Sequence, residues 1–96
     1  MESKQRVKTF SFHWGSGYIA EEAQVEGEYH VPTLQLMRYT DGHAAGSVSV
    51  RFCQYNHRGG FRRSPLMMGE EEVEMMREAL RATPELRELL RRMVED

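Results

Sequence analysis

The spacing of hydrophobic residues changes once along this chain, near Gly69, and that change constrains the fold more than any other feature. Upstream, apolar and polar residues alternate, most clearly over residues 47–55, where Val48, Val50 and Phe52 share one face. Downstream, apolar residues recur at helical spacing. A period of two is typical of strands, and a period near 3.6 is typical of amphipathic helices. We therefore predict an α+β fold, in which an antiparallel β-sheet of four to five strands is followed by two C-terminal amphipathic helices.

The length of 96 residues is enough for one hydrophobic core, so we predict a single domain over residues 1–96. The sheet should occupy about residues 7–68, and the helices about 70–82 and 84–95. Thr83-Pro84 separates the helices, because a residue before proline avoids the α region and proline is favoured at the first position of a helix.

Turn-forming residues divide the upstream part into strands. Gly15-Ser16-Gly17 and Thr40-Asp41-Gly42 accept the backbone angles that tight turns need, as do the residues from 56 to 60. Pro32 should interrupt a strand, since it has no N–H to donate. The polar face of the 47–55 strand should contact solvent. The predicted strands cover residues 7–14, most of 18–31, 33–39, 47–55 and 61–68.

The sequence favours a cytoplasmic protein that does not enter a membrane. No stretch approaches the roughly 20 consecutive apolar residues that a bilayer requires. The segment Met1 to Arg6 lacks the apolar core of a signal peptide. The single cysteine, Cys53, cannot form an intrachain disulfide, so the small core must be stable without one or gain buried area by self-association.

Charge is sorted along the chain, although the formal net charge is only −2. Residues 34–69 hold five arginines against one aspartate, whereas residues 70–96 hold nine acidic residues against five arginines. An evenly solvated surface usually mixes its signs. A basic segment beside an acidic one therefore indicates a face that meets an anion.

Residues that could carry catalysis or hold a metal are few. Cys53 and His57 have C-x3-H spacing, but a zinc site needs a second pair of ligands and the chain has no second thiol. The acidic run Glu70 to Glu74 is typical of the first turns of a helix. The glycine-rich turns lack a P-loop lysine and a dinucleotide fingerprint. We predict no catalytic residue, no metal, no cofactor and no enzyme activity.

Cations and aromatic rings alternate in the last two strands and the loop between them. Single-stranded nucleic acid needs both, because cations contact its phosphates while rings stack on its bases. The alternative is that Phe61 belongs to the core and the arginines are solvated or paired with the glutamate-rich helix. The predicted nucleic-acid-binding residues are Arg38, Arg51, Tyr55, His57, Arg58, Phe61, Arg62 and Arg63.

The second helix carries a wide apolar stripe at positions i, i+3, i+4, i+7 and i+8. Such a stripe must pack on the sheet or on a second copy of the chain, and we expect a homodimer. The residues predicted to form this dimer or partner interface are Met76, Leu80, Leu86, Leu89, Leu90, Met93 and Val94.

Residues 33–82 resemble the PC4 family of transcriptional coactivators. The resemblance rests on Leu34 to Tyr39, Val48 to Arg51 and Arg62 to Met68, followed by Glu70-Glu71-Glu72 and an amphipathic helix. It implies a curved four-stranded antiparallel sheet followed by a helix. It further implies dimerisation through that helix and binding of single-stranded DNA by the sheet surfaces.

Single positions match this family unevenly. Arg51 resembles a strand arginine of the family, and Arg62 and Arg63 lie where its basic residues precede the last strand. The usual basic-glycine step is replaced here by Arg63-Ser64-Pro65, and the tryptophan that often follows the strand arginine is absent. The second helix, Pro84 to Glu95, lies outside the core of the family.

Two functions from different classes stay open at this point. The first is a single-stranded nucleic-acid-binding module, with DNA or RNA as its partner and an accessory role in transcription or DNA maintenance. The second is a homodimeric protein-interaction or structural domain that uses its C-terminal helices and binds no nucleic acid.

Overall fold

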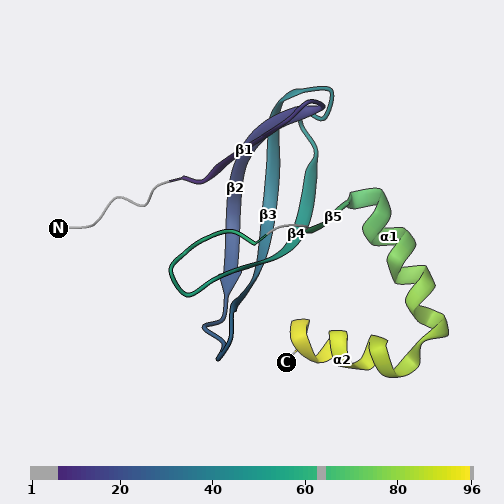
Figure 1. Cartoon of the computed structure of the whole chain (residues 1–96). Helices are drawn as coiled ribbons and strands as arrows, with labels where there is room; N and C mark the ends of the chain where they lie inside the picture. The colour runs from purple at the N-terminus through teal and green to yellow at the C-terminus, as the bar shows by residue number, and fades with distance from the viewer. Residues whose placement is uncertain (1–6, 63–64, 96) are drawn as a thin grey trace.

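The computed structural model describes residues 7–62 and 65–95. A five-stranded antiparallel sheet, in which the strands pair in sequence order, is followed by two helices (Figure 1). The strands are β1 (Thr9–Phe12), β2 (Gly15–Gln24), β3 (Val31–Gly42), β4 (Val48–Tyr55) and β5 (Leu66–Gly69). The helical elements are α1 (Glu70–Ala79), the 3-10 turn η1 (Leu80–Ala82) and α2 (Pro84–Val94). The predicted α+β class, with the sheet first and two helices after it, is confirmed.

The register of β3 and β4 sorts their side chains onto two faces of the sheet. Gln35 lies opposite Arg51, and Leu36 lies opposite Val50. Because successive residues of a strand point to opposite sides, odd-numbered residues of both strands share one face and even-numbered residues share the other. We call these the inner face and the outer face. The buried residues of β3 all lie on the inner face, and they are Val31, Thr33, Gln35, Met37 and Tyr39.

The polar side chains of β4 lie on this inner face, where the sequence predicts solvent contact. Arg51 and Cys53 are partly buried and contact the buried Gln35. The apolar residues of β4, such as Val50 and Phe52, lie on the outer face instead. Alternation identifies the two faces of a strand, but the curvature of the sheet decides which face is enclosed.

The sheet is strongly curled. Lys8 directly precedes β1, yet its Nζ lies 4.8 Å from the centroid of the Tyr55 ring in β4. In a flat sheet, three steps of about 4.8 Å each would separate these two strands. Irregularities in the β2–β3 register, at Ser16/Gly17 and at Ile19/Glu21, contribute to this shape because bulges bend a strand. The inner face is therefore concave.

The hydrophobic core lies at one end of the concave face. Phe10, Met37 and Tyr39 are buried there. Trp14 stacks on Phe12 with ring centroids 4.6 Å apart, and its Nε1 donates a hydrogen bond to the Tyr39 hydroxyl at 3.2 Å. The partly buried residues packed against this core are Phe12, Ile19, Ala44 and Met67.

The glycine-rich segment Gly15 to Gly17 lies inside β2 and does not form the predicted turn. The turn is instead made by His13 and Trp14. A Cβ atom at Gly17 would lie 1.9 Å from the carbonyl oxygen of Arg38 in the neighbouring strand. Glycine is therefore required here by the close approach of two backbones rather than by a turn.

Several strand boundaries also differ from the prediction. β2 ends at Gln24 rather than near residue 31, and Thr40 to Gly42, predicted as a turn, belong to β3. Pro32 lies within β3, where its carbonyl accepts a hydrogen bond from the N–H of Val25 at 3.1 Å. The N and C=O of one strand residue point toward the same neighbouring strand, so the nitrogen of Pro32 also faces the β2 side. Because β2 ends at Gln24, no residue of that strand lies opposite this nitrogen. Among the described residues of the predicted 61–68 strand, Leu66 to Met68 belong to β5 (Leu66–Gly69) and Phe61 forms an isolated bridge.

The helices start where the sequence predicts, and neither contains a buried residue. Glu72 accepts a hydrogen bond from the N–H of Gly69 at 3.0 Å, which satisfies a free donor at the start of α1. Pro84 occupies the first turn of α2. In Figure 1, α1 leads away from β5 and α2 turns back toward the sheet. Across the part of the chain that the structure describes, no helix has the length and apolar character to cross a bilayer.

Candidate functional site

Three of the predicted nucleic-acid-binding residues come together on the inner face. Phe61 forms an isolated bridge with Tyr55, which places its ring beside the end of β4. The Tyr55 and Phe61 rings pack edge to face, with centroids 5.3 Å apart. The guanidinium carbon of Arg51 lies 4.9 Å from the centroid of the Phe61 ring. Phe61 is 45% exposed, so this cation and ring are open to a ligand.

The other predicted residues do not join this group. Arg38 pairs with Val48 on the outer face, and Arg62 lines the groove on that face. His57 and Arg58 lie in the turn after β4, where His57 Nδ1 is 2.7 Å from a carboxylate oxygen of Glu26. Arg63 lies outside the described residues. The predicted binding residues are thus divided between two faces and a loop.

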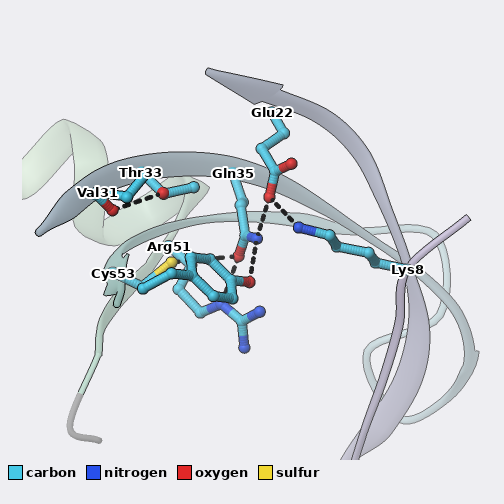
Figure 2. Close-up of polar contacts among 8 residues, drawn as sticks. Lys8, Glu22, Val31, Thr33, Gln35, Arg51 and Cys53 are labelled. Atoms are coloured by element: carbon cyan, nitrogen blue, oxygen red, sulfur yellow. Dashed lines mark hydrogen bonds and ion pairs between the residues drawn. The ribbon is translucent and has the colours of Figure 1, made fainter. Parts of the chain in front are cut away.

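A polar cluster that the sequence analysis missed lies beside Arg51 and Tyr55. Gln35 is its centre (Figure 2). The Gln35 amide nitrogen donates to Glu22 Oε2 at 2.7 Å and to the Tyr55 hydroxyl at 3.0 Å. Its oxygen accepts from Arg51 Nε at 2.7 Å and from Cys53 Sγ at 3.5 Å. We call this set the inner polar cluster, and it consists of Lys8, Glu22, Gln35, Arg51, Cys53 and Tyr55.

Lys8 and Glu22 form the charged pair of this cluster, with Nζ and Oε2 2.8 Å apart. Partial burial lowers the pKa of Lys8, but the hydrogen bond and the charge of Glu22 outweigh this effect, and the pKa is raised. Partial burial also raises the pKa of Glu22. Hydrogen bonds from Lys8 and Gln35, together with the charges of Lys8 and Arg51, outweigh it, so that pKa is lowered. Both groups are therefore held in their charged forms.

Cys53 contributes a neutral thiol to the cluster. Burial raises its pKa, against the smaller opposite effect of Arg51, so the thiol stays protonated near neutral pH. The thiolate is the reactive and metal-binding form of cysteine. Over residues 7–62 and 65–95, no three His, Cys, Asp or Glu side chains gather where they could hold a metal ion.

Three arginines of the C-terminal segment are paired with acidic residues, whereas the described arginines of the basic segment are not. On the helices, Arg77 pairs with Glu74, Arg81 with Glu78, and Arg91 with both Glu88 and Glu95. Four arginines of the basic segment lie among the described residues and form no ion pair with any of them, and they are Arg38, Arg51, Arg58 and Arg62. Four glutamates of the C-terminal segment, Glu74, Glu78, Glu88 and Glu95, are thus paired with arginines three or four residues away.

The apolar stripe of α2 faces the outer face of the sheet across a groove. Leu90 and Met93 line this groove together with Leu34 and Phe52, and its volume is about 680 Å³. Leu80 and Leu90 are partly buried. The other predicted interface residues are from 43% to 77% exposed, and they are Met76, Leu86, Leu89, Met93 and Val94. Within this single chain, the stripe is therefore only partly covered.

Comparisons of the chain with protein-family models, with curated proteins and with solved structures find no match.

Proposed function

We propose that the chain is a cytoplasmic single-stranded nucleic-acid-binding module, and that the concave inner face is its binding surface. One observation carries the proposal: the Arg51 guanidinium lies 4.9 Å above the half-exposed Phe61 ring, with the Tyr55 ring against its edge. A phosphate needs the cation, and an unpaired base needs the ring. The arrangement supplies both within one short stretch of surface.

The electrostatics of the inner face support an anionic ligand of this kind. Arg51 has no carboxylate partner among the described residues, and its nearest polar partner is the neutral amide of Gln35. Lys8 adds a second cation whose side chain is 46% exposed, although Glu22 neutralises part of its charge. The curvature of the sheet brings Lys8 to the Tyr55 ring, so cations flank the rings on two sides. A flexible single strand fits such a surface better than a stiff duplex does.

Fluorescence anisotropy with a labelled oligothymidine of about 16 nucleotides tests the proposal. The wild-type chain should bind, and an unlabelled duplex should compete poorly. Phe61→Ala should weaken binding by about 5- to 150-fold, because stacking on one base contributes about 1 to 3 kcal/mol. An oligouridine of equal length then separates a preference for DNA from one for RNA.

A matched control uses another exposed aromatic residue. Tyr29 is 80% exposed at the bend between β2 and β3, and it takes no part in the ring and cation contacts that join Arg51, Tyr55 and Phe61. Tyr29→Ala should leave the affinity unchanged. If the wild-type chain fails to bind at low salt, or if Tyr29→Ala and Phe61→Ala weaken binding equally, the inner face is not the binding surface.

We further propose that the chain forms a homodimer through its helices. The partly covered stripe of α2 and the apolar groove beside it support this. An open apolar groove leaves its lining side chains in water, and a second copy of the chain would remove that surface from solvent. The groove beside α2 lies on the outer face and the Arg51 and Phe61 pair lies on the inner face, so dimerisation through α2 would leave that pair accessible.

Sedimentation equilibrium at micromolar concentration tests this part. The wild-type chain should be dimeric, and Leu89→Asp should shift it to monomer because the new carboxylate would be buried in an apolar contact. Arg92→Asp places the same residue among the polar side chains of α2 and should leave the dimer intact. A monomeric wild type, or a chain truncated after Thr83 that keeps its oligomeric state and stability, would contradict the dimer.

A further inference from the structure

Gln35 is an unusual residue for the middle of a central strand. It is a large polar side chain with only 1% of its surface exposed. A buried amide is costly unless its hydrogen-bonding groups find partners. Both donors and the oxygen of Gln35 have partners, so the side chain is held from several directions at once.

The orientation of this amide is dictated by two of its partners. Arg51 Nε can only donate a hydrogen bond, and the charged carboxylate of Glu22 can only accept one. The amide oxygen must therefore face Arg51 and the amide nitrogen must face Glu22. The ion pair between Lys8 and Glu22 keeps that carboxylate in place and charged. Arg51 thus faces a fixed acceptor rather than a rotating one.

The contact with Gln35 uses only the Nε–H of Arg51. Figure 2 shows the terminal nitrogens of Arg51 pointing away from the contacts of the cluster. None of the described residues accepts a hydrogen bond from them. An arginine held by Nε presents its two terminal amino groups as a planar pair of donors, which suits two oxygens of one phosphate. Fixing the side chain beforehand also reduces the conformational entropy that binding must remove.

We infer that Gln35 is a positioning residue, which holds Arg51 by Nε so that its terminal amino groups form a two-donor site for a phosphate of the bound strand. This inference rests on the proposed function, and it assigns to Gln35 no contact with the ligand. Its effect on binding passes through Arg51. Two predictions follow: removing the amide should matter only when Arg51 is present, and the Arg51 Nε–H should be protected from exchange before any ligand binds.

A double-mutant cycle measures the first property. All chains carry Tyr55→Phe, which keeps the ring but removes the hydroxyl that Gln35 also contacts. Gln35→Met, an apolar side chain of similar length, should weaken oligothymidine binding by about tenfold when Arg51 is present. In the Arg51→Ala background, the same change should weaken binding by less than about twofold. A residue that merely supports the fold would weaken binding equally in both backgrounds.

Nuclear magnetic resonance of the free wild-type chain measures the second property and needs no variant to fold. The Arg51 Nε–H signal should exchange slowly with water, whereas that of Arg38, on the outer face, should exchange fast. Rapid exchange at Arg51 would overturn the inference. So would equal losses in both arms of the cycle, provided that Arg51→Ala itself weakens binding, and the proposed function would then survive. A wild-type chain that binds no oligonucleotide would overturn both.

Discussion

Gln35 and Arg51 lie opposite each other on the two central strands, and Arg51 Nε donates a hydrogen bond to Gln35 Oε1 at 2.7 Å. This contact joins the buried interior of the sheet to the part of its concave face that carries exposed rings. On the buried side, the Gln35 amide nitrogen donates hydrogen bonds to Glu22 and Tyr55. On the open side, the Arg51 guanidinium lies over the Phe61 ring. The proposed binding surface is therefore supported by the packed centre of the fold.

The Lys8–Glu22 pair should make stability depend on acid pH. The pKa of Glu22 is lowered in the folded chain, so its stabilising effect is present above the ordinary value of 4.5 and is lost as pH falls through the folded value. Glu22→Gln should therefore reduce the free energy of unfolding near neutral pH and make less difference at an acidic pH well below 4.5. Urea denaturation at both pH values measures this, with Glu28→Gln as an exposed control. A Glu22→Gln effect of equal size at both pH values would contradict the assignment.

The Lys8–Glu22 pair should also make stability depend on alkaline pH, where stability falls as the pH rises. The pKa of Lys8 is raised in the folded chain, so its contribution is present below the ordinary value of 10.5 and is lost as pH rises through the folded value. Lys8→Met should destabilise the chain at neutral pH, and the difference from wild type should shrink only above that ordinary value. A difference that vanishes between neutral pH and 10.5 would show that another group is responsible.

Gly17 should be among the least replaceable residues of the sheet. An alanine Cβ there would lie 1.9 Å from the Arg38 carbonyl oxygen, so β2 and β3 would have to separate. Gly17→Ala should cost about 2 kcal/mol or more of stability. Gly46 has a φ of +88° but open space around it, and Gly46→Ala should cost only about 1 kcal/mol. Thermal unfolding that ranks the two variants in the reverse order would contradict the tight contact.

The salt dependence of oligonucleotide affinity should reveal the contact between Arg51 and a phosphate. Each phosphate neutralised on a single strand contributes about 0.7 to the slope of log affinity against log salt. In a salt titration followed by anisotropy, Arg51→Ala should reduce the magnitude of that slope by about 0.7, the contribution of one phosphate contact. Arg81 is already paired with Glu78, so Arg81→Ala should leave the slope unchanged. Equal slopes for wild type and Arg51→Ala would remove Arg51 from the phosphate contacts.

Local patterns predict the elements of this fold better than they predict the site. The existence of β4 and the Thr83-Pro84 boundary depend on neighbouring residues, and both are predicted correctly from the sequence, although the polar face of β4 is the enclosed one. Gly17 is misread as a turn residue because its requirement arises from Arg38, which is distant in the sequence. Propensity favours a turn for such a segment, and tertiary contact overrides it.

The inner polar cluster is hidden from sequence reading for a related reason. Glu22 meets Gln35 only through a register that contains two irregularities, and Lys8 reaches Tyr55 only because the sheet curls. Arg51, Tyr55 and Phe61 are found because they belong to one hairpin-like segment. Arg38 and Arg62 are grouped with them by charge alone, and charge does not encode the face on which a residue lies.

The most direct measurement is a map of amide chemical-shift changes as oligothymidine is added to the labelled chain. Binding to the concave face should produce changes centred on Arg51, Tyr55 and Phe61, extending to Lys8. Changes of comparable size are not expected at Arg38, which lies on the outer face. Changes confined to the outer face, or no changes at saturating oligonucleotide, would contradict the claim that the concave face binds single-stranded nucleic acid.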